Sequence, residues 1–268
     1  MRIAYLGTPQ IAVAPLEALI AAGHEVCCVV SGPDTRRGRG AAMSPTPVKA
    51  AALAHDVPVT SELADVLNCG AELGVVVAYG SIIPMTILNQ LPMVNLHFSL
   101  LPRWRGAAPV ERAILAGDEL TGVCVMEVAE GLDTGGVFAS CSTPIAHKTL
   151  SELWQELSEL GSALLCAALD AGLSGPAAQA GEPTYATKLT VDDRRIDWSD
   201  TAIQQDRVVR LGGAWTTFGG KRVKILSARL SEDGSQLLPT RVQPEGKSGM
   251  EFEDFRRGAR MQQGDWFQ

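Results

Sequence analysis

Three polar side chains have the types needed to move a proton and to stabilise a negatively charged oxygen. Asn95 and His97 lie two residues apart in the apolar segment VNLHF, residues 94–98, which predicts a buried strand. Side chains two apart on a strand point to the same face, so both are expected to project together. Asp133 follows another apolar segment and stands among glycines in EGLDTGG, residues 130–136. An amide donor, an imidazole and a carboxylate can together bind an oxyanion, transfer a proton and fix the histidine tautomer.

Other uses of these residues fit the sequence less well. A histidine beside an asparagine is more often a structural pair than a catalytic one, so the hypothesis depends on Asp133. A serine hydrolase built on Ser99 would need a G-x-S-x-G turn, and the residues around Ser99 do not supply it. The first predicted turn, GTPQ at residues 7–10, could bind an anion but lacks the G-x-G-x-x-G of a dinucleotide fold. NAD is therefore not expected.

Short apolar segments alternate with helical patterns in the first two thirds of the chain, and this order predicts the scaffold. Strands are expected at residues 3–6, 26–30, 75–78, 94–98 and 122–128, and helices at 11–22, 47–55, 111–116 and from 150 onward. TLSE at residues 149–152 is a capping box for the last helix. The order is typical of an α/β fold, a doubly wound and mostly parallel sheet with helices on both faces. Ligands of such sheets bind beyond the carboxyl ends of the strands, where Asn95 and His97 are expected.

The chain changes character after about residue 172. Small residues dominate 175–183 and polar residues dominate 186–200, which favours a domain boundary there. A helix at 203–210, a strand at 215–218, a Gly219-Gly220 turn and a strand at 223–226 then predict a small β-rich module. We predict a catalytic domain over residues 1–185, a linker over 186–200 and a shortened, barrel-like module of OB type over 201–268.

Composition and charge narrow the class of protein. Of the 268 residues, 46% are hydrophobic and 20% are charged, as in ordinary globular proteins. The net charge of -7 argues against a protein that coats nucleic acid non-specifically. From Thr201 onward the chain carries 11 basic and 8 acidic residues, whereas the rest carries 12 and 22. A surface for a polyanion is therefore expected to be local.

The cysteines and the apolar segments predict where the protein works. The six cysteines form no C-x-x-C pair, which favours free thiols in a reducing compartment and argues against a metal site. No segment approaches the roughly 18 apolar residues of a membrane span. A soluble, cytoplasmic protein without metal is expected.

Longer motifs surround the three candidate residues and continue along the chain. They are NLHFSLLPRWRGAAP at 95–109, GLDTG at 131–135, GTP at 7–9, RGRG at 37–40, SPTPVK at 44–49, AYG at 78–80, GAWTTF at 213–218 and VQPEGK at 242–247. Their order and spacing resemble the methionyl-tRNA formyltransferase family over most of the chain. The resemblance implies transfer of a formyl group from 10-formyltetrahydrofolate to the amino group of initiator methionyl-tRNA.

The resemblance also implies roles for individual residues. Asn95 and His97 would polarise the formyl carbonyl and stabilise the tetrahedral intermediate, and Asp133 would orient His97 and help to move the proton of the amine. The implied folate-binding residues are Ser99, Leu100, Leu101, Pro102, Tyr79, Gly80, Ile82, Ile83 and Leu132. Because the formyl donor is already activated, such an enzyme needs positioning and oxyanion stabilisation rather than a metal.

The basic residues of the chain have two interpretations. A charged loop is usually only solvated, but the resemblance implies that RRGRG, residues 36–40, enters the acceptor stem of the tRNA. The implied tRNA-binding residues are Arg36, Arg37, Arg39, Lys221 and Arg222. The chain departs from the family pattern at Ile11, usually Phe, and at LGG, residues 211–213, usually P-W-P-G. Residues 223–242 are also too few for the complete C-terminal barrel, by roughly two strands.

Two other functions stay open at this point. Glycinamide ribonucleotide formyltransferase shares the catalytic trio but lacks a C-terminal module like AWT, residues 214–216. A catalytically silent tRNA-binding module would not need Asn95, His97 and Asp133. The resemblance favours an enzyme that acts on a folate and an initiator methionyl-tRNA, and we expect it to be a monomer that acts away from membranes.

Overall fold

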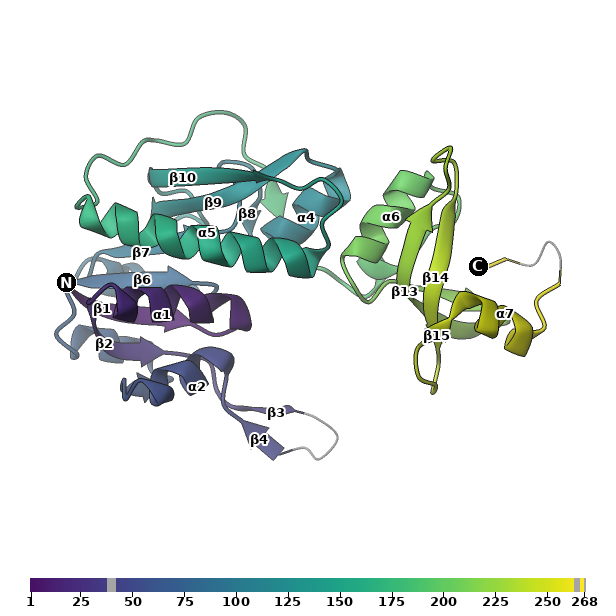
Figure 1. Ribbon diagram of the computed structural model, residues 1–268. Helices are drawn as coiled ribbons and strands as arrows, with labels where there is room; N and C mark the ends of the chain where they lie inside the picture. Colours follow the sequence, from purple (N-terminus) through teal and green to yellow (C-terminus); the bar gives the residue numbers. More distant parts are fainter. Residues whose placement is uncertain (38–41, 263–265, 268) are drawn as a thin grey trace. The chain divides into compact units, whose positions relative to one another are not determined.

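The computed structural model describes residues 1–37, 42–262 and 266–267 (Figure 1). The chain folds into two compact units. The first unit contains Met1–Pro109, Leu120–Pro144 and Trp154–Thr187, and the second contains Val110–Glu119, Ile145–Leu153 and Lys188–Gln268. The candidate trio and the predicted folate-binding residues all belong to the first unit.

A seven-stranded sheet forms the centre of the first unit, in the order β10-β9-β7-β6-β1-β2-β5. The parallel strands are β1 (Arg2–Gly7), β2 (Glu25–Val30), β5 (Val59–Thr60), β6 (Leu73–Val77) and β7 (Met93–His97). β9 (Leu120–Glu127) runs antiparallel to β7, and β10 (Val137–Pro144) runs antiparallel to β9. All five residues of β6 are buried, as expected for a parallel strand covered on both faces. The predicted α/β fold with a mostly parallel sheet is confirmed.

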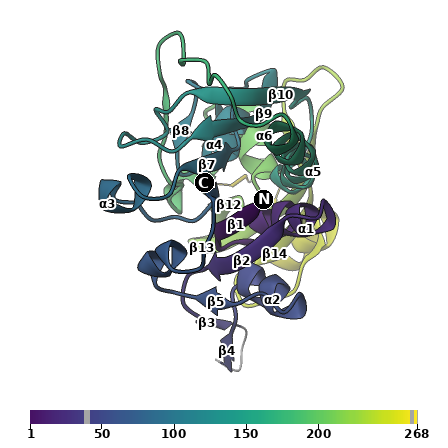
Figure 2. The same ribbon diagram turned by 90° about the vertical axis from the view of Figure 1, so that its left-hand side faces the viewer.

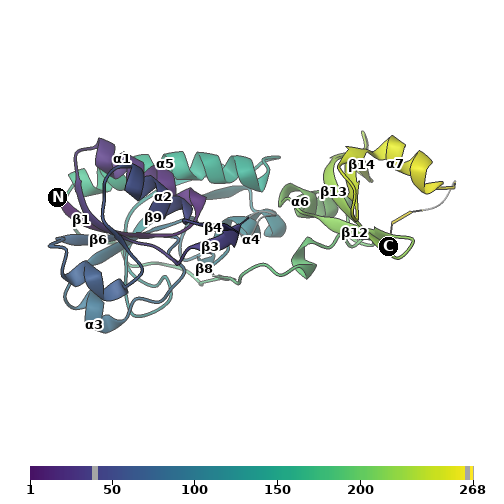
Figure 3. The same ribbon diagram turned by 90° about the horizontal axis from the view of Figure 1, so that it is seen from below.

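Helices lie on both sides of this sheet. Figures 2 and 3 show α1 (Val13–Ala21) and α5 (Leu150–Asp170) on one side and α3 (Met85–Leu88) on the other. A Cβ atom added at Gly161 of α5 would lie 3.0 Å from the Leu96 side chain and 3.2 Å from that of Val123. Glycine therefore allows α5 to approach β7 and β9 closely, and this packing holds the strand that carries Asn95 and His97.

Side-chain caps mark the starts of two helices, one of which was predicted. The Thr149 amide donates to Glu152 Oε2 at 2.7 Å, and the Glu152 amide donates to Thr149 Oγ1 at 3.3 Å. These two bonds confirm the predicted capping box at the start of α5, and bonds from Thr149 lower the pKa of Glu152. At α2 (Pro47–Ala54), the Thr46 hydroxyl accepts from the Lys49 amide.

Besides several short elements such as β5 and α3, two longer features of the first unit are absent from the sequence prediction. One is β10, an edge strand in which six of eight residues are small or polar. The other is a hairpin of β3 (Thr35–Arg37) and β4 (Ala42–Ser44) within the basic stretch. Edge strands bury less apolar surface than central ones, so their sequences show little of the apolar pattern on which strand prediction depends.

The second unit contains a four-stranded antiparallel sheet in the order β12-β13-β14-β15. Its strands are β12 (Trp215–Phe218), β13 (Lys221–Leu230), β14 (Leu237–Pro244) and β15 (Met250–Glu251). The helices α6 (Ala202–Arg210) and α7 (Phe252–Ala259) and most of α4 (Pro109–Ala116) belong to the same unit. The predicted β-rich C-terminal part is confirmed, whereas β14, β15 and α7 were not expected.

A separate apolar core holds the second unit together. Its buried residues include Val223, Ile225, Leu237, Val242, Phe252 and Phe255. Ile196, only 1% exposed, belongs to this core, and Trp198 Nε1 donates to Thr216 Oγ1 at 2.8 Å. Residues 196 and 198 therefore pack into the second unit. In the part of the chain that the structure describes, no helix is long and apolar enough to cross a membrane.

Candidate active site

The structure brings the three predicted catalytic residues together beside the carboxyl end of β7. Asn95 Nδ2 donates to Asp133 Oδ1 at 3.4 Å, and His97 Nδ1 lies 3.6 Å from Asp133 Oδ2. The side chains of His97 and Asp133 are only 6% and 14% exposed. Charge interactions in such a shielded site are stronger than in water, so the carboxylate can act strongly on both neighbours.

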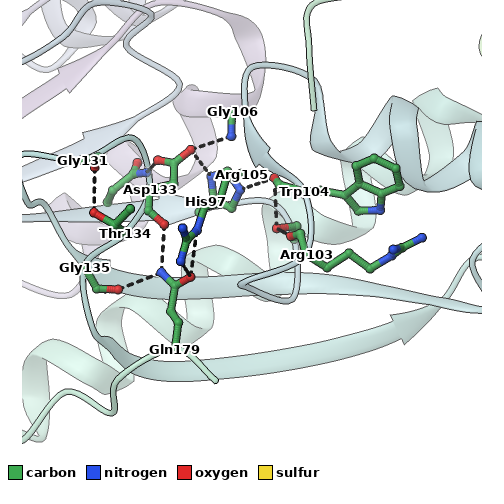
Figure 4. A network of polar contacts seen from close by, with 12 residues as sticks. His97, Arg103, Trp104, Arg105, Gly106, Gly131, Asp133, Thr134, Gly135 and Gln179 are labelled. Atoms are coloured by element: carbon green, nitrogen blue, oxygen red, sulfur yellow. Dashed lines mark hydrogen bonds and ion pairs between the residues drawn. The ribbon is translucent and has the colours of Figure 1, made fainter. Parts of the chain in front are cut away.

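The second ring nitrogen of His97 is held by the backbone. Nε2 lies 2.9 Å from the carbonyl oxygen of Trp104 (Figure 4). A carbonyl oxygen can only accept a hydrogen bond, so this contact requires a hydrogen on Nε2. Nδ1 is then the nitrogen that faces the Asp133 carboxylate.

Asp133 has a left-handed backbone conformation. Its φ is 50°, which Asp adopts more readily than most residues, and it lies in the loop between β9 and β10. Thr134 Oγ1 donates to the Gly131 carbonyl at 3.1 Å within the same loop. The Gly106 amide donates to Asp133 Oδ2 at 2.7 Å, so the carboxylate is bound from both β7 and the loop that follows it.

Ser99 is not arranged as a nucleophile. It is 1% exposed, and its hydroxyl donates to the carbonyl oxygen of Arg103 at 2.6 Å. His97 Nε2 contacts the Trp104 carbonyl instead. A serine hydrolase needs its histidine to accept the hydrogen of the serine hydroxyl. Here the Ser99 hydroxyl and His97 Nε2 each bond to a backbone carbonyl instead.

The predicted folate-binding residues lie in three loops. Ser99, Leu100, Leu101 and Pro102 form the turn after β7, and Tyr79, Gly80, Ile82 and Ile83 follow β6. Because β6 and β7 are parallel neighbours, both loops begin at the same edge of the sheet. Leu132 precedes Asp133 in the third loop.

The apolar side chains of these loops differ in exposure. Ile83 is 8% exposed and packs in the core, with Tyr79 against the same cluster. Burial raises the pKa of the Tyr79 hydroxyl. Ile82 and Leu132, by contrast, are 86% and 59% exposed, so neither contributes to a packed core. Large exposed apolar side chains beside a polar cluster are typical of surfaces that a ligand covers.

Other residues that hold the site were not predicted from the sequence. Trp104 and Gly106 contact the trio through backbone groups, and Arg105 between them contacts Gln179 through its side chain. β8 (Arg105–Gly106) pairs with β11 (Tyr185–Ala186). Gln179 and Thr184 come from the segment after α5; the Thr184 hydroxyl accepts from the Trp104 amide at 2.9 Å. Side-chain types carry no signal for the contacts made by backbone groups, and the side chains of Gln179 and Thr184 come from a distant segment without a motif, so sequence inspection misses both kinds of residue.

Gly106→Ala should destabilise the protein by about 1–3 kcal/mol and lower its activity. Gly106 has φ +111°, and an added Cβ would lie 3.0 Å from the Ala186 carbonyl oxygen, while its amide holds Asp133. Thermal unfolding and activity assays of the variant measure both effects. Gly258→Ala is the matched control, since nothing lies within 4 Å of that position, and it should be neutral or slightly stabilising. Equal stability of the two variants would contradict this account of Gly106.

The predicted tRNA-binding residues fall into two groups in different units. Arg36, which is exposed, and Arg37 belong to β3 of the first unit, and Arg39 lies outside the described residues. Lys221 and Arg222 begin β13 of the second unit, and both are exposed.

Arg222 also belongs to a basic pocket that the sequence did not indicate. Its guanidinium lies 3.8 Å from the ring centroid of Trp215, and that of Arg195 lies 5.6 Å from the same ring. A cavity of about 300 Å³ is lined there by Arg194, Trp215, Arg222 and Lys224, among others. Cationic side chains around a partly exposed aromatic ring are suited to a phosphate-containing polymer.

The structure also bears on the predictions about cysteines and metals. All six cysteines are free, as predicted; Cys28 and Cys124 are buried and the others are partly buried. Burial raises the pKa of the Cys124 thiol, which makes it a weak nucleophile. Among residues 1–37, 42–262 and 266–267, no group of three or more His, Cys, Asp or Glu side chains is placed to hold a metal ion.

Solved structures with the same fold include proteins of several activities. A methionyl-tRNA formyltransferase from Clostridium thermocellum matches with a TM-score of 0.66 and 17% identity, over 91% of this chain and 98% of that one. HypX from Aquifex aeolicus, in complex with tetrahydrofolic acid, matches with a TM-score of 0.67 and 19% identity. That match covers 96% of this chain, which spans about half of HypX, 47%. At these identities the likeness concerns the fold.

Sequence comparisons are more specific. The formyl transferase family model matches residues 1–169, and the model of the formyl transferase C-terminal domain matches residues 188–239. A methionyl-tRNA formyltransferase of Roseobacter denitrificans is 41% identical over 302 aligned residues, covering 100% of this chain and 99% of that protein. The corresponding protein of Cereibacter sphaeroides is 42% identical, covering 98% of both. The chain therefore belongs to the methionyl-tRNA formyltransferase family.

Proposed function

We propose that the protein transfers the formyl group of 10-formyltetrahydrofolate to the amino group of methionyl-tRNA and so produces N-formylmethionyl initiator tRNA. The observation that carries the proposal is the 41% identity along the whole chain to a protein of that name. The cluster of Asn95, His97 and Asp133 supports it, because an amide, an imidazole and a carboxylate are the groups that acyl transfer to an amine requires.

The reaction needs one bond to form and one to break at the formyl carbon. The amino nitrogen of methionine attacks that carbon, and the bond from the carbon to N10 of the folate then breaks. Asn95 donates its amide hydrogen to the oxygen that becomes negative in between. The pair of His97 and Asp133 takes the proton of the attacking amine. The same proton is then transferred to N10 of the folate, which leaves as tetrahydrofolate. Atoms and charge are thereby conserved without a further reactant.

We assign the folate to the loops that follow β6, β7 and β9. The exposed Ile82 and Leu132 support this assignment, since they could cover an aromatic pterin beside the trio. The loop at Ser99, Leu100, Leu101 and Pro102 supplies backbone groups at the same sheet edge. The HypX structure contains tetrahydrofolic acid in a protein of the same fold, which also supports a folate site here.

We assign the tRNA to the two basic groups, one on each unit. Arg36, Arg37 and Arg39 would contact the acceptor stem, and Lys221 and Arg222 would contact the phosphate backbone. The basic pocket around Trp215 supports the second contact, because Arg194, Arg222 and Lys224 place three cations about one cavity. We further propose that the protein acts as a monomer in the cytoplasm; its free cysteines support the reducing compartment.

Arg222→Ala should weaken the use of methionyl-tRNA and leave the KM for the folate unchanged. Each phosphate contact that is lost reduces the number of counterions released on binding. The slope of log affinity against log salt should therefore become less steep by roughly 0.7–0.9. Measuring KM for both substrates at several salt concentrations checks this. Arg229→Ala removes the same charge from the same strand, outside the pocket, and should have little effect. An unchanged salt slope in Arg222→Ala would remove this residue from the tRNA contact.

An acceptor assay tests the proposed function. The purified protein, 10-formyltetrahydrofolate labelled in the formyl group, and one acceptor at a time are incubated, and label in the acceptor is counted. Charged initiator tRNA is expected to be formylated, whereas glycinamide ribonucleotide and uncharged tRNA should stay unlabelled. Labelling of glycinamide ribonucleotide in preference to charged tRNA would show that the protein is a different formyltransferase. If neither acceptor is labelled, the protein is a tRNA-binding module without catalytic activity.

A further inference from the structure

The segment after α5 returns to the loops of the active site. β11, at Tyr185–Ala186, pairs with β8, and the Val137 and Ala177 main chains are joined by a β-bridge. Every residue from 174 to 183 is exposed except Gln179, which is partly buried. A single polar side chain directed inward from an exposed segment calls for a structural or functional reason.

Gln179 contacts two loops at once (Figure 4). Its Nε2 donates to the carbonyl oxygens of Asp133 and Gly135, both at 2.8 Å. Its Oε1 accepts from Arg105, at 3.1 Å from Nε and 2.7 Å from Nη2. All hydrogen-bonding groups of the amide are therefore used. Asp133 and Gly135 belong to the loop that carries the carboxylate, and Arg105 belongs to the loop that contacts the carboxylate and the His97 ring.

These contacts close a ring of interactions around the acid. Arg105 lies between Trp104, whose carbonyl holds His97, and Gly106, whose amide holds the Asp133 carboxylate. Gln179 joins this loop to the main chain of Asp133, which has the uncommon φ of 50°. Loss of the Gln179 amide would remove its contacts between the two loops and leave the bond from the Gly106 amide, so the carboxylate could move relative to His97.

We propose that Gln179 is a positioning residue for formyl transfer. It acts through the main chain of Asp133, and the inference rests on the proposed function. A displacement of the order of 1 Å at a catalytic group can cost about a hundredfold in rate. Gln179→Ala should therefore lower kcat about 10- to 100-fold, while the KM values for folate and methionyl-tRNA stay within about twofold.

Gln179→Glu gives the sharper comparison. The carboxylate keeps the acceptor for Arg105 but replaces the two hydrogens directed at Asp133 and Gly135 with an oxygen, which the carbonyl oxygens repel. It should lose at least as much kcat as Gln179→Ala although it is nearly the same size. Gln90→Ala is the matched control, because Gln90 donates to the Thr86 carbonyl on an exposed turn and should leave kcat unchanged.

The experiment measures kcat, both KM values, the pH profile of kcat and thermal unfolding for wild type and variants. A fall in kcat with unchanged KM values and an altered pH profile is expected, because the geometry of the His97–Asp133 pair changes. Wild-type kcat in folded Gln179→Ala, or a loss confined to KM or to stability, would overturn the proposal. If Gln179→Ala fails to fold, Arg105→Lys is measured instead, because lysine cannot make both hydrogen bonds of Arg105 to Gln179 Oε1. It must show a smaller fall in kcat, again with unchanged KM values. A wild-type protein that does not formylate methionyl-tRNA would refute the proposed function instead.

Discussion

His97→Ala is expected to lose formyl transfer by about 10²- to 10⁴-fold. The imidazole is the group that transfers the proton in the proposed reaction, its Nδ1 lies 3.6 Å from the Asp133 carboxylate, and the pair is shielded from water. Asp133→Asn keeps the size of the side chain but removes its charge, and it should show a loss of the same order. The kcat of each variant with saturating folate and charged tRNA measures the effect.

Controls separate this loss from a folding defect. His97→Gln retains a donor for the Trp104 carbonyl and should be as inactive as His97→Ala but more stable. His55→Ala removes an exposed histidine and should have wild-type activity. Since the two residues act as a unit, a double variant of His97 and Asp133 should lose little more than either single variant. Near-normal turnover in a folded His97→Gln protein would exclude His97 from the chemistry.

Asn95→Ala is expected to raise the activation free energy by about 3 kcal/mol, which is more than a hundredfold in kcat. The hydrogen bond from Asn95 Nδ2 to Asp133 Oδ1 is long, at 3.4 Å. A weak bond of this kind leaves the amide able to turn toward an oxyanion. A group that binds only the transition state lowers kcat and kcat/KM equally, and the Kd for the folate should stay near its wild-type value.

Folate binding measured without the tRNA distinguishes this role from a purely structural one. Asn89→Ala, at the exposed end of α3, provides a matched loss of an asparagine outside the site. If Asn95→Ala binds folate much more weakly and retains its kcat, Asn95 shapes the folate pocket and does not stabilise the oxyanion.

The sequence supported the prediction of the central scaffold because buried elements carry strong patterns. β1, β2, β6 and β7 are short apolar runs, and TLSE at 149–152 marked the start of α5. β10 and β14 were missed, since strands that are partly exposed have no continuous apolar run. α7 was missed for a related reason: only Phe252 and Phe255 of its eight residues are buried.

The candidate trio could be predicted, whereas the contacts that hold it could not. Asn95 and His97 are two apart on a strand, and Asp133 stands among glycines, so residue types and spacing sufficed. The supports of the trio are the Trp104 carbonyl, the Gly106 amide and Gln179. The first two are backbone groups present at every residue, and Gln179 lies 46 positions from Asp133. Only the folded chain brings these groups together.

The central claim is that the cluster of Asn95, His97 and Asp133 transfers a formyl group to methionyl-tRNA, and a single-turnover experiment tests it most directly. Excess protein is mixed with 10-formyltetrahydrofolate and charged initiator tRNA, and the amino acid released from the tRNA by hydrolysis is identified by mass. Wild type should convert the bound methionine to N-formylmethionine, and His97→Gln should leave it as methionine over the same interval. Unmodified methionine with wild type, or N-formylmethionine formed equally fast by both proteins, would contradict the account.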